Sequence, residues 1–195
     1  YFKLSIKRAR ILKKAVNKIG ALDEILKGLK TKEDVDHLLI YCEDMDQLSK
    51  SQEIVDKYNL ISHKFTGVEA LTDRKKILNN FDEKNYNALL AIKCLDEGVN
   101  VPSTQKAIFM ASSGNNREYI QRRGRVLRKS EATGKTKAEI FDLIVLPPSD
   151  ADDQISKRIV KSEFTRLKEF ADCANNFAEI IDSIFDTMKK YRVYL

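Results

Sequence analysis

His37-Leu38-Leu39-Ile40-Tyr41-Cys42 sets the architecture of this chain of 195 residues. A short apolar run without alternating polar residues is typical of a strand buried on both faces. Further strands are expected at 61–65, 88–92, 106–111 and 138–146, and helices at 46–58, 71–81 and 117–127. Thr72 is expected to cap the helix at 71–81. Single helices between short strands indicate an α/β fold with a mostly parallel sheet and helices on both faces.

Helical patterns flank this α/β segment on both sides. Apolar residues recur every three or four positions between residues 2 and 30, where Gly20 is expected to separate two helices or to kink one. After Pro147-Pro148, the same spacing predicts a long amphipathic helix, or two with a break near residues 173–176. The expected domains are a helical lead-in at 1–32, an α/β lobe at 33–148 and a helical extension at 149–195.

The composition limits the class of protein. Hydrophobic residues make up 43% and charged residues 33% of the chain, as in a globular protein with a sizeable core. No apolar run approaches the ~18 residues that a membrane span needs, so no membrane association is expected. The net charge of +6 favours an anionic partner such as nucleic acid, although a plain basic surface is the alternative. The chain begins at Tyr1 without an initiator Met, which suggests a fragment of a longer protein.

The cysteines and histidines do not suggest a metal site. Cys42, Cys94 and Cys173 are widely spaced and form no CxxC pair, so they are expected to be reduced, in a cytoplasmic protein. Neither His37 nor His63 is near a cysteine in sequence, so no zinc site is expected.

Gln121-Arg122-Arg123-Gly124-Arg125-Val126-Leu127-Arg128 places four arginines within eight residues. In a helix, at about 100° per residue, Gln121, Arg125 and Arg128 fall within one narrow arc. Two planar guanidinium groups and an amide on one face suit the capture of a phosphate better than a merely solvated surface. Arg123 falls on the apolar side, where a structural role is as plausible as a functional one.

Three loops follow expected strands directly: Thr66-Gly67, residues 94–102 and residues 112–116. The carboxyl ends of parallel strands meet at one edge of a sheet, where α/β proteins bind their ligands. We therefore expect these loops to lie along one edge with the arginine segment. Thr66 could equally be a plain strand end, and Asp96 and Glu97 could simply cap a turn.

Gly134-Lys135-Thr136 resembles the last three residues of a P-loop motif. The full motif requires a glycine five residues earlier, where this chain has Lys129, and it should follow a strand and open a helix. Here it precedes an expected strand, so Gly134 is expected to mark a turn. The chain thus has arginines suited to a triphosphate but no loop to hold one.

Motifs in this order resemble those in the C-terminal RecA-like lobe of superfamily 2 DEAD/DEAH-like helicases and translocases. Residues 38–42 look like motif IV, residues 92–102 like motif V and residues 121–128 like motif VI. The similarity is closest to relatives of the repair helicase XPB and to the motor subunits of type I and type III restriction enzymes. It covers residues 5–148, and the DEGxxxP sequence followed by motif VI at this spacing is highly specific.

The resemblance implies that ATP with Mg²⁺ binds between two RecA-like lobes. The N-terminal lobe, from which residues 1–32 would lead into the α/β lobe, supplies the P-loop and holds the Mg²⁺. Arg125 and Arg128 would reach the γ-phosphate as arginine fingers, and Gln121 would register its presence. Such a finger accelerates phosphoryl transfer by about 10³–10⁵-fold.

Motif V has implied roles beside the nucleotide. Gly98 would allow close backbone approach, while Asp96 and Glu97 would couple the ATP cleft to the nucleic-acid track. Asn100 stands where many relatives have an Asp that meets the ribose hydroxyls, so this contact would lose a charge.

Other residues are implied in nucleic-acid binding. The resemblance assigns backbone contacts to the following positions: Thr66, Gly67, Ile92, Lys93 and Arg122. Many relatives have Thr where this chain has Ile92, so Lys93 or a backbone N–H would have to replace that hydroxyl. Phosphate contacts carry no sequence information, so little sequence preference is expected. Arg74 resembles the family's arginine after motif IVa, but a charged helix start explains it equally.

The resemblance implies the C-terminal motor lobe of an ATP-dependent helicase or translocase acting on nucleic acid, with DNA preferred. Without a P-loop, the chain alone should not hydrolyse ATP. The alternative is a non-catalytic nucleic-acid-binding or sensor module with a helicase-like fold. Expected partners are the N-terminal lobe and, by analogy with restriction enzymes, nuclease or specificity subunits.

Overall fold

The computed structural model describes residues 2–92, 101, 103–111, 124, 126, 135–148 and 153–193. The chain forms two compact units, residues 1–143 and 144–195. The domain boundaries expected at residues 32 and 148 remain predictions.

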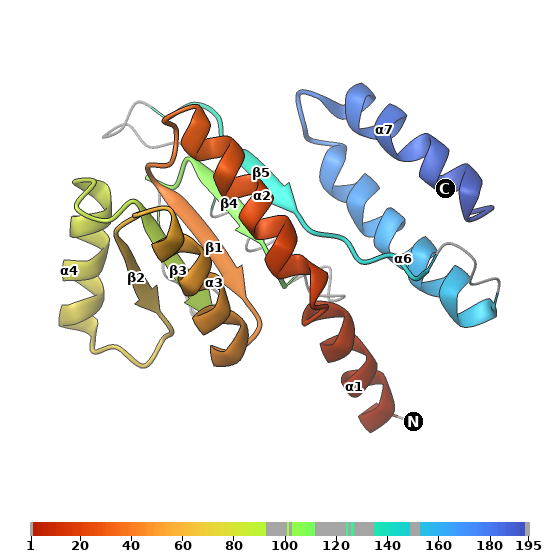
Figure 1. The fold of residues 1–195 in the computed structure, drawn as a ribbon, viewed down its shortest axis with the longest axis horizontal. Coiled ribbons are helices and arrows are strands. Elements are labelled where there is room, and N and C mark those ends of the chain that lie inside the picture. The colour runs from red at the N-terminus through yellow and green to blue at the C-terminus, as the bar shows by residue number, and fades with distance from the viewer. Residues whose placement is uncertain are drawn as a thin grey trace. The chain divides into compact units, whose positions relative to one another are not determined.

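The first unit contains a five-stranded parallel sheet with the strand order β2-β3-β1-β4-β5 (Figure 1). Its strands are β1 (Leu38–Cys42), β2 (Ser62–Phe65), β3 (Ala88–Ile92), β4 (Lys106–Phe109) and β5 (Glu139–Asp142). All five residues of the central β1 are buried, which explains why its sequence is continuously apolar. The predicted α/β fold with a parallel sheet is confirmed.

The two helices between the first three strands also agree with the sequence pattern. α3 (Met45–Lys57) begins after Asp44, whose carboxylate accepts a hydrogen bond from the N–H of Gln47. α4 (Leu71–Asp82) matches its expected range, but the predicted cap was wrong. Ala70 occupies the N-cap position of α4, and no side chain caps this helix. The helix expected at 117–127 lies outside the described residues except for Gly124 and Val126, which are both helical.

The N-terminal break lies at residues 14–16, between α1 (Phe2–Lys13) and α2 (Asn17–Thr31), and not at Gly20. Gly20 lies inside α2, where nothing forces a bend. Contacts with the start of α3 hold the chain at the observed break: Gln47 donates a hydrogen bond to the Lys13 carbonyl at 3.0 Å, and Lys14 pairs with Asp44 at 2.8 Å. Distant side chains therefore contact the chain where the first helix ends.

β5 is much shorter than the apolar stretch 138–146 suggested. Its ladder with β4 runs from Lys106 opposite Glu139 to Phe109 opposite Asp142, and one more backbone bond joins the Leu143 N–H to the Phe109 carbonyl. β4 itself has only four residues, so β4 offers the edge strand no further residues for pairing. Its length is limited by its neighbour.

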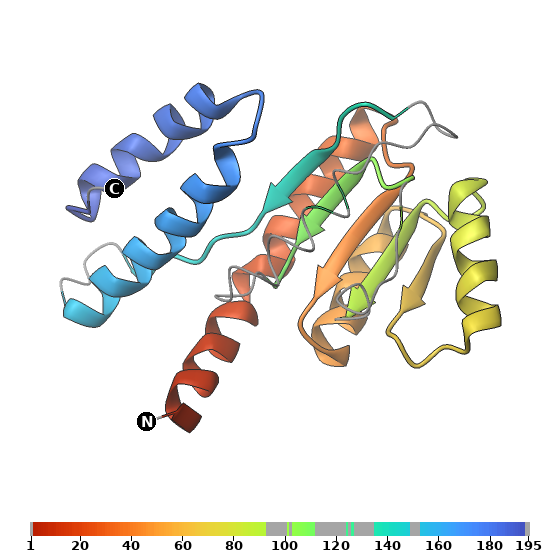
Figure 2. The same ribbon diagram turned by 180° about the vertical axis from the view of Figure 1, so that it is seen from behind.

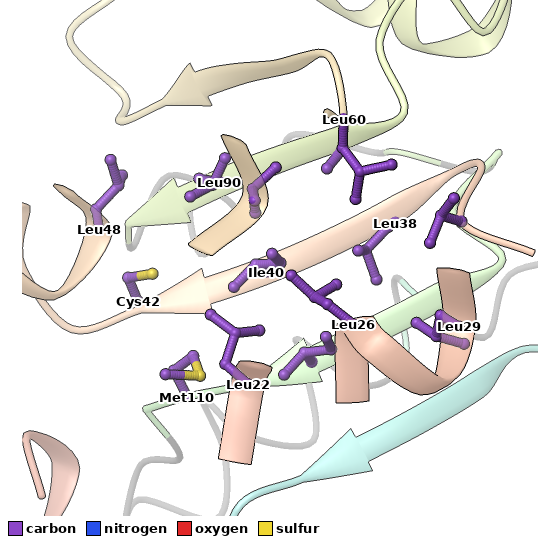
Figure 3. Packing of buried hydrophobic residues seen from close by; sticks show 14 residues of the cluster. Leu22, Leu26, Leu29, Leu38, Ile40, Cys42, Leu48, Leu60, Leu90 and Met110 are labelled. Carbon is purple, nitrogen blue, oxygen red and sulfur yellow. The ribbon is translucent and has the colours of Figure 1, made fainter. Parts of the chain in front are cut away.

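α2 and α3 cover one face of the sheet, and Figure 2 shows the sheet from behind with both helices on its far side. Leu22, Leu26 and Leu29 of α2 pack into the same buried cluster as β-strand residues (Figure 3). The strand members of this cluster include Leu38, Ile40, Leu90 and Ile108. α2 is therefore part of the core of this unit.

The second unit contains α6 (Gln154–Ala171) and α7 (Phe177–Lys190), which confirms the predicted break near residues 173–176. Val160 and Phe164 of α6 and Ile184 of α7 form its small core. Asp153 caps α6 by accepting hydrogen bonds from the N–H groups of Ile155 and Ser156. None of the helices within the described part of the chain has the length and apolar character to cross a membrane.

Two cysteines differ sharply in their expected reactivity. Cys42 is buried at the end of β1, and this burial raises the pKa of its thiol to about 12, whereas Cys173 is exposed. The thiolate is the reactive species. In a Cys94→Ser variant, Ellman's reagent is therefore expected to modify one thiol of the native chain rapidly and the second only after unfolding. Rapid modification of two thiols under native conditions would contradict the burial of Cys42.

Candidate nucleic-acid interface

The loop after β2 and the end of β3 share the carboxyl edge of the sheet. Phe65 pairs with Ala91, so Thr66 follows β2 at the level where Ile92 ends β3. Thr66 and Gly67 are half-buried. Ile92 packs against the core cluster, so its side chain contributes to the core. Three of the predicted nucleic-acid contacts thus lie at the carboxyl ends of adjoining strands, two in the loop after β2 and one at the last residue of β3.

The Glu69 carboxylate accepts hydrogen bonds from the N–H and O–H donors of this loop. Glu69 Oε1 accepts hydrogen bonds from the N–H and the hydroxyl of Thr66, both at 2.8 Å. Glu69 Oε2 accepts a hydrogen bond from the Gly67 N–H at 2.7 Å. Burial alone would raise the pKa of Glu69, but these hydrogen bonds outweigh it and hold the pKa below its usual value. The loop is therefore a set of converging donors that stabilises an anion.

Arg74 of α4 donates hydrogen bonds to two main-chain carbonyls of the same loop. Its Nε donates to the Glu69 carbonyl at 3.0 Å, and its Nη2 donates to the Gly67 carbonyl. Gly67 has a φ of 90°, a left-handed conformation that glycine adopts without strain. Arg74 thus has a defined structural role in this loop, and its correspondence to the family's arginine after motif IVa stays a prediction.

Glu69 is a residue that the sequence interpretation missed. The pattern Thr66-x-x-Glu69 matches the spacing of a capping box, in which a hydroxyl residue and a carboxylate three positions later bond to each other's backbone. That spacing could have identified the pair. The pair does not stand at the N-cap of a helix, however, because α4 begins only at Leu71.

The tip of this loop is open to solvent. Val68 is 90% exposed and Leu71 is 76% exposed. Two large apolar side chains are thus accessible to solvent beside the polar donors of this loop.

The loop after β1 carries carboxylates that lysines neutralise. Lys13 pairs with Glu43 at 3.1 Å, and Lys14 pairs with Asp44 at 2.8 Å and with Asp46 at 3.3 Å. Burial would raise the pKa of Asp44, but hydrogen bonds from Lys14 and the Gln47 N–H lower it. These carboxylates are paired with lysines, so they repel a phosphate at this edge less than unpaired charges would.

Lys135, the lysine of the P-loop look-alike, has a structural role. It is buried, and its Nζ donates a hydrogen bond to the carbonyl of Val126, inside the arginine segment. Burial lowers the pKa of Lys135 to about 8. This contact joins Lys135, just before β5, to Val126 of the arginine segment. The turn expected at Gly134 lies outside the described residues.

The remaining predicted site residues lie outside the described part of the chain, so their roles stay predictions. They are Lys93, Asp96, Glu97, Gly98, Asn100, Gln121, Arg122, Arg125 and Arg128. Within the described residues, no three His, Cys, Asp or Glu side chains are placed to hold a metal ion.

The fold defines a class of protein. The C-terminal part of the Fun30 ATPase domain superimposes with a TM-score of 0.59 at 19% identity, over 75% of this chain and 44% of that one. The C-terminal domain of the DEAD-box protein Dbp5 gives a TM-score of 0.57 at 18% identity, over 80% of this chain and 79% of that one. The first unit is therefore a RecA-like lobe.

Sequence similarity identifies the family. The chain belongs to the helicase conserved C-terminal domain family, whose profile matches residues 17–130. It is also 34% identical over 86 residues to the DNA 3'-5' translocase XPB2 of Sulfurisphaera tokodaii. That match covers 44% of this chain but only 18% of the length of the relative.

Proposed function

We propose that this chain is the C-terminal motor lobe of an ATP-dependent helicase or translocase that acts on nucleic acid. The observation that carries the proposal is the family match across residues 17–130, which includes both motif V and the arginine segment. The donor loop at Thr66-Gly67 supports it, because a parallel α/β sheet binds its ligands at this edge.

The nucleotide half of the proposal assigns Arg125 and Arg128 as fingers toward the γ-phosphate, with Gln121 beside them. ATP with Mg²⁺ supplies the phosphoryl group, and a first lobe supplies the P-loop. Arginine suits this task because its rigid fork of N–H donors matches phosphate oxygens. The motif V residues Asp96, Glu97, Gly98 and Asn100 would line the same cleft and couple it to the nucleic acid.

The nucleic-acid half assigns backbone contacts to the donor loop and to the end of β3. Thr66 and Gly67 provide N–H and O–H donors, and Lys93 and Arg122 would add positive charge. DNA is the preferred substrate because the relative from Sulfurisphaera tokodaii is named a DNA translocase. The resemblance to restriction motors adds nuclease or specificity subunits as proposed partners, in the cytoplasm.

The test compares the chain with the protein that contains both lobes. Because phosphoryl transfer needs the P-loop and the fingers together, the isolated chain is expected to show no ATP hydrolysis above background. The two-lobed protein is expected to hydrolyse ATP and to be stimulated by double-stranded DNA, single-stranded DNA or RNA. Phosphate release with each polymer measures this. A two-lobed protein that binds DNA but never hydrolyses ATP would favour the non-catalytic alternative.

A further inference from the structure

The Glu69 carboxylate is bound as a phosphate would be. Its two oxygens accept three hydrogen bonds of 2.7–2.8 Å from two consecutive residues, Thr66 and Gly67. Backbone N–H groups and a hydroxyl converging on an oxyanion are the donors that commonly hold phosphates in proteins. The donors proposed to contact nucleic acid are thus occupied by a side chain of the same loop.

The shape of the loop does not depend on this carboxylate alone. Arg74 bonds to the carbonyls of Gly67 and Glu69, which are main-chain atoms, and Gly67 takes its left-handed φ without strain. When the Glu69 side chain swings away, these contacts still hold the backbone. The donors of Thr66 and Gly67 would then remain in place for another anion.

The loop also gives an incoming phosphate access. Glu69 itself is only half-buried, and its neighbours Val68 and Ala70 are exposed. A side chain at the surface can leave its donors without opening the core. The lowered pKa of Glu69 agrees with a loop that stabilises negative charge.

From this geometry we infer that Glu69 is an internal competitor for a nucleic-acid phosphate at Thr66 and Gly67. The inference rests on the proposed nucleic-acid role of this edge. A backbone phosphate takes over the two N–H donors and the hydroxyl, and the Glu69 carboxylate moves into solvent. Glu69 thereby weakens binding and keeps the donors satisfied while no nucleic acid is bound.

The test is a change that removes the charge and keeps the size of the side chain. In Glu69→Gln, the amide oxygen can still accept from Thr66, but the amide nitrogen cannot accept from the Gly67 N–H. We expect the variant chain to bind a single-stranded oligonucleotide at least about tenfold more tightly, since one hydrogen bond to a charged group corresponds to a ratio of at least about ten. Fluorescence anisotropy at low salt measures the affinity.

A matched control separates local competition from net charge. Glu53→Gln makes the same change at an exposed position of α3, so it reports the general effect of removing one negative charge. Glu69→Ala should increase affinity in the same direction as Glu69→Gln. If both Glu69 variants bind the oligonucleotide no more tightly than Glu53→Gln does, then Glu69 only stabilises the loop and the inference is wrong.

A second probe distinguishes this inference from the proposed function. In Glu69→Gln, inorganic phosphate should shift the amide NMR signals of Thr66 and Gly67 at lower concentration than in the wild-type chain. Equal phosphate responses in the two chains would overturn the competition, whatever the oligonucleotide does. Competition for phosphate without any oligonucleotide binding would instead count against the nucleic-acid role of this edge.

Discussion

Replacing Arg125 by alanine in the two-lobed protein is expected to lower nucleic-acid-stimulated ATP hydrolysis by about 10³–10⁵-fold. In the proposed role the guanidinium would offset negative charge that develops on the γ-phosphate in the transition state, so its loss would affect the chemical step. ATP binding should change little, because the P-loop of the proposed first lobe would provide most of the ground-state contacts. Steady-state hydrolysis and fluorescent-nucleotide binding, measured on the same preparation, separate these two effects.

The matched control for this experiment is Lys30→Ala, which removes a positive charge from an exposed position of α2. It should leave the hydrolysis rate nearly unchanged. Arg128→Ala should resemble Arg125→Ala, because both guanidiniums are assigned to the same phosphate. Normal turnover in the Arg125 variant would refute its assignment as a finger, and a rise in the Kd for ATP alone would place it in ground-state binding.

Replacing Leu26 by alanine is expected to lower the free energy of unfolding of the chain by about 2–5 kcal/mol. Leu26 is fully buried in α2 and belongs to the cluster that includes Leu38, Ile40 and Ile108 (Figure 3). The substitution removes apolar contacts and leaves a cavity between the helix and the sheet. Urea unfolding followed by circular dichroism measures the change.

Leu71→Ala provides the same substitution at a leucine that is 76% exposed. It should change the free energy of unfolding by less than about 0.5 kcal/mol. The comparison also tests where the α/β lobe begins. Similar, small effects of the two substitutions would mean that α2 is only a lead-in to the lobe, as the boundary expected at residue 32 implies.

The secondary structure was predictable where burial is continuous. β1 and β3 lie inside the sheet between two neighbours each, so their apolar runs at 38–42 and 88–92 correspond closely to the strands observed. The break between α6 and α7 was also predictable, since the apolar spacing is interrupted there. In these places the local apolar pattern is enough to predict the secondary structure, because the apolar side chains face a core.

The errors occur where a distant part of the chain sets a boundary. β5 ends early because β4 offers only four residues for pairing. The first helix ends at Lys13, near the contacts made by Gln47 and Asp44, and Gly20 lies within the second helix. Neither boundary could be found from periodicity, because the residues that impose it lie dozens of positions away.

The candidate site shows the same division. The residue types that suit phosphate, at Thr66-Gly67 and at Gln121–Arg128, are visible in the chain because spacing and chemistry are local properties. The order of the strands is decided only by the tertiary structure. The same holds for two contacts between distant residues: buried Lys135 donates a hydrogen bond to the Val126 carbonyl, and Lys18 donates one to the Met110 carbonyl at 2.7 Å. Parallel strands pair through backbone groups that every residue possesses, so their neighbours are chosen by the packing of the whole lobe.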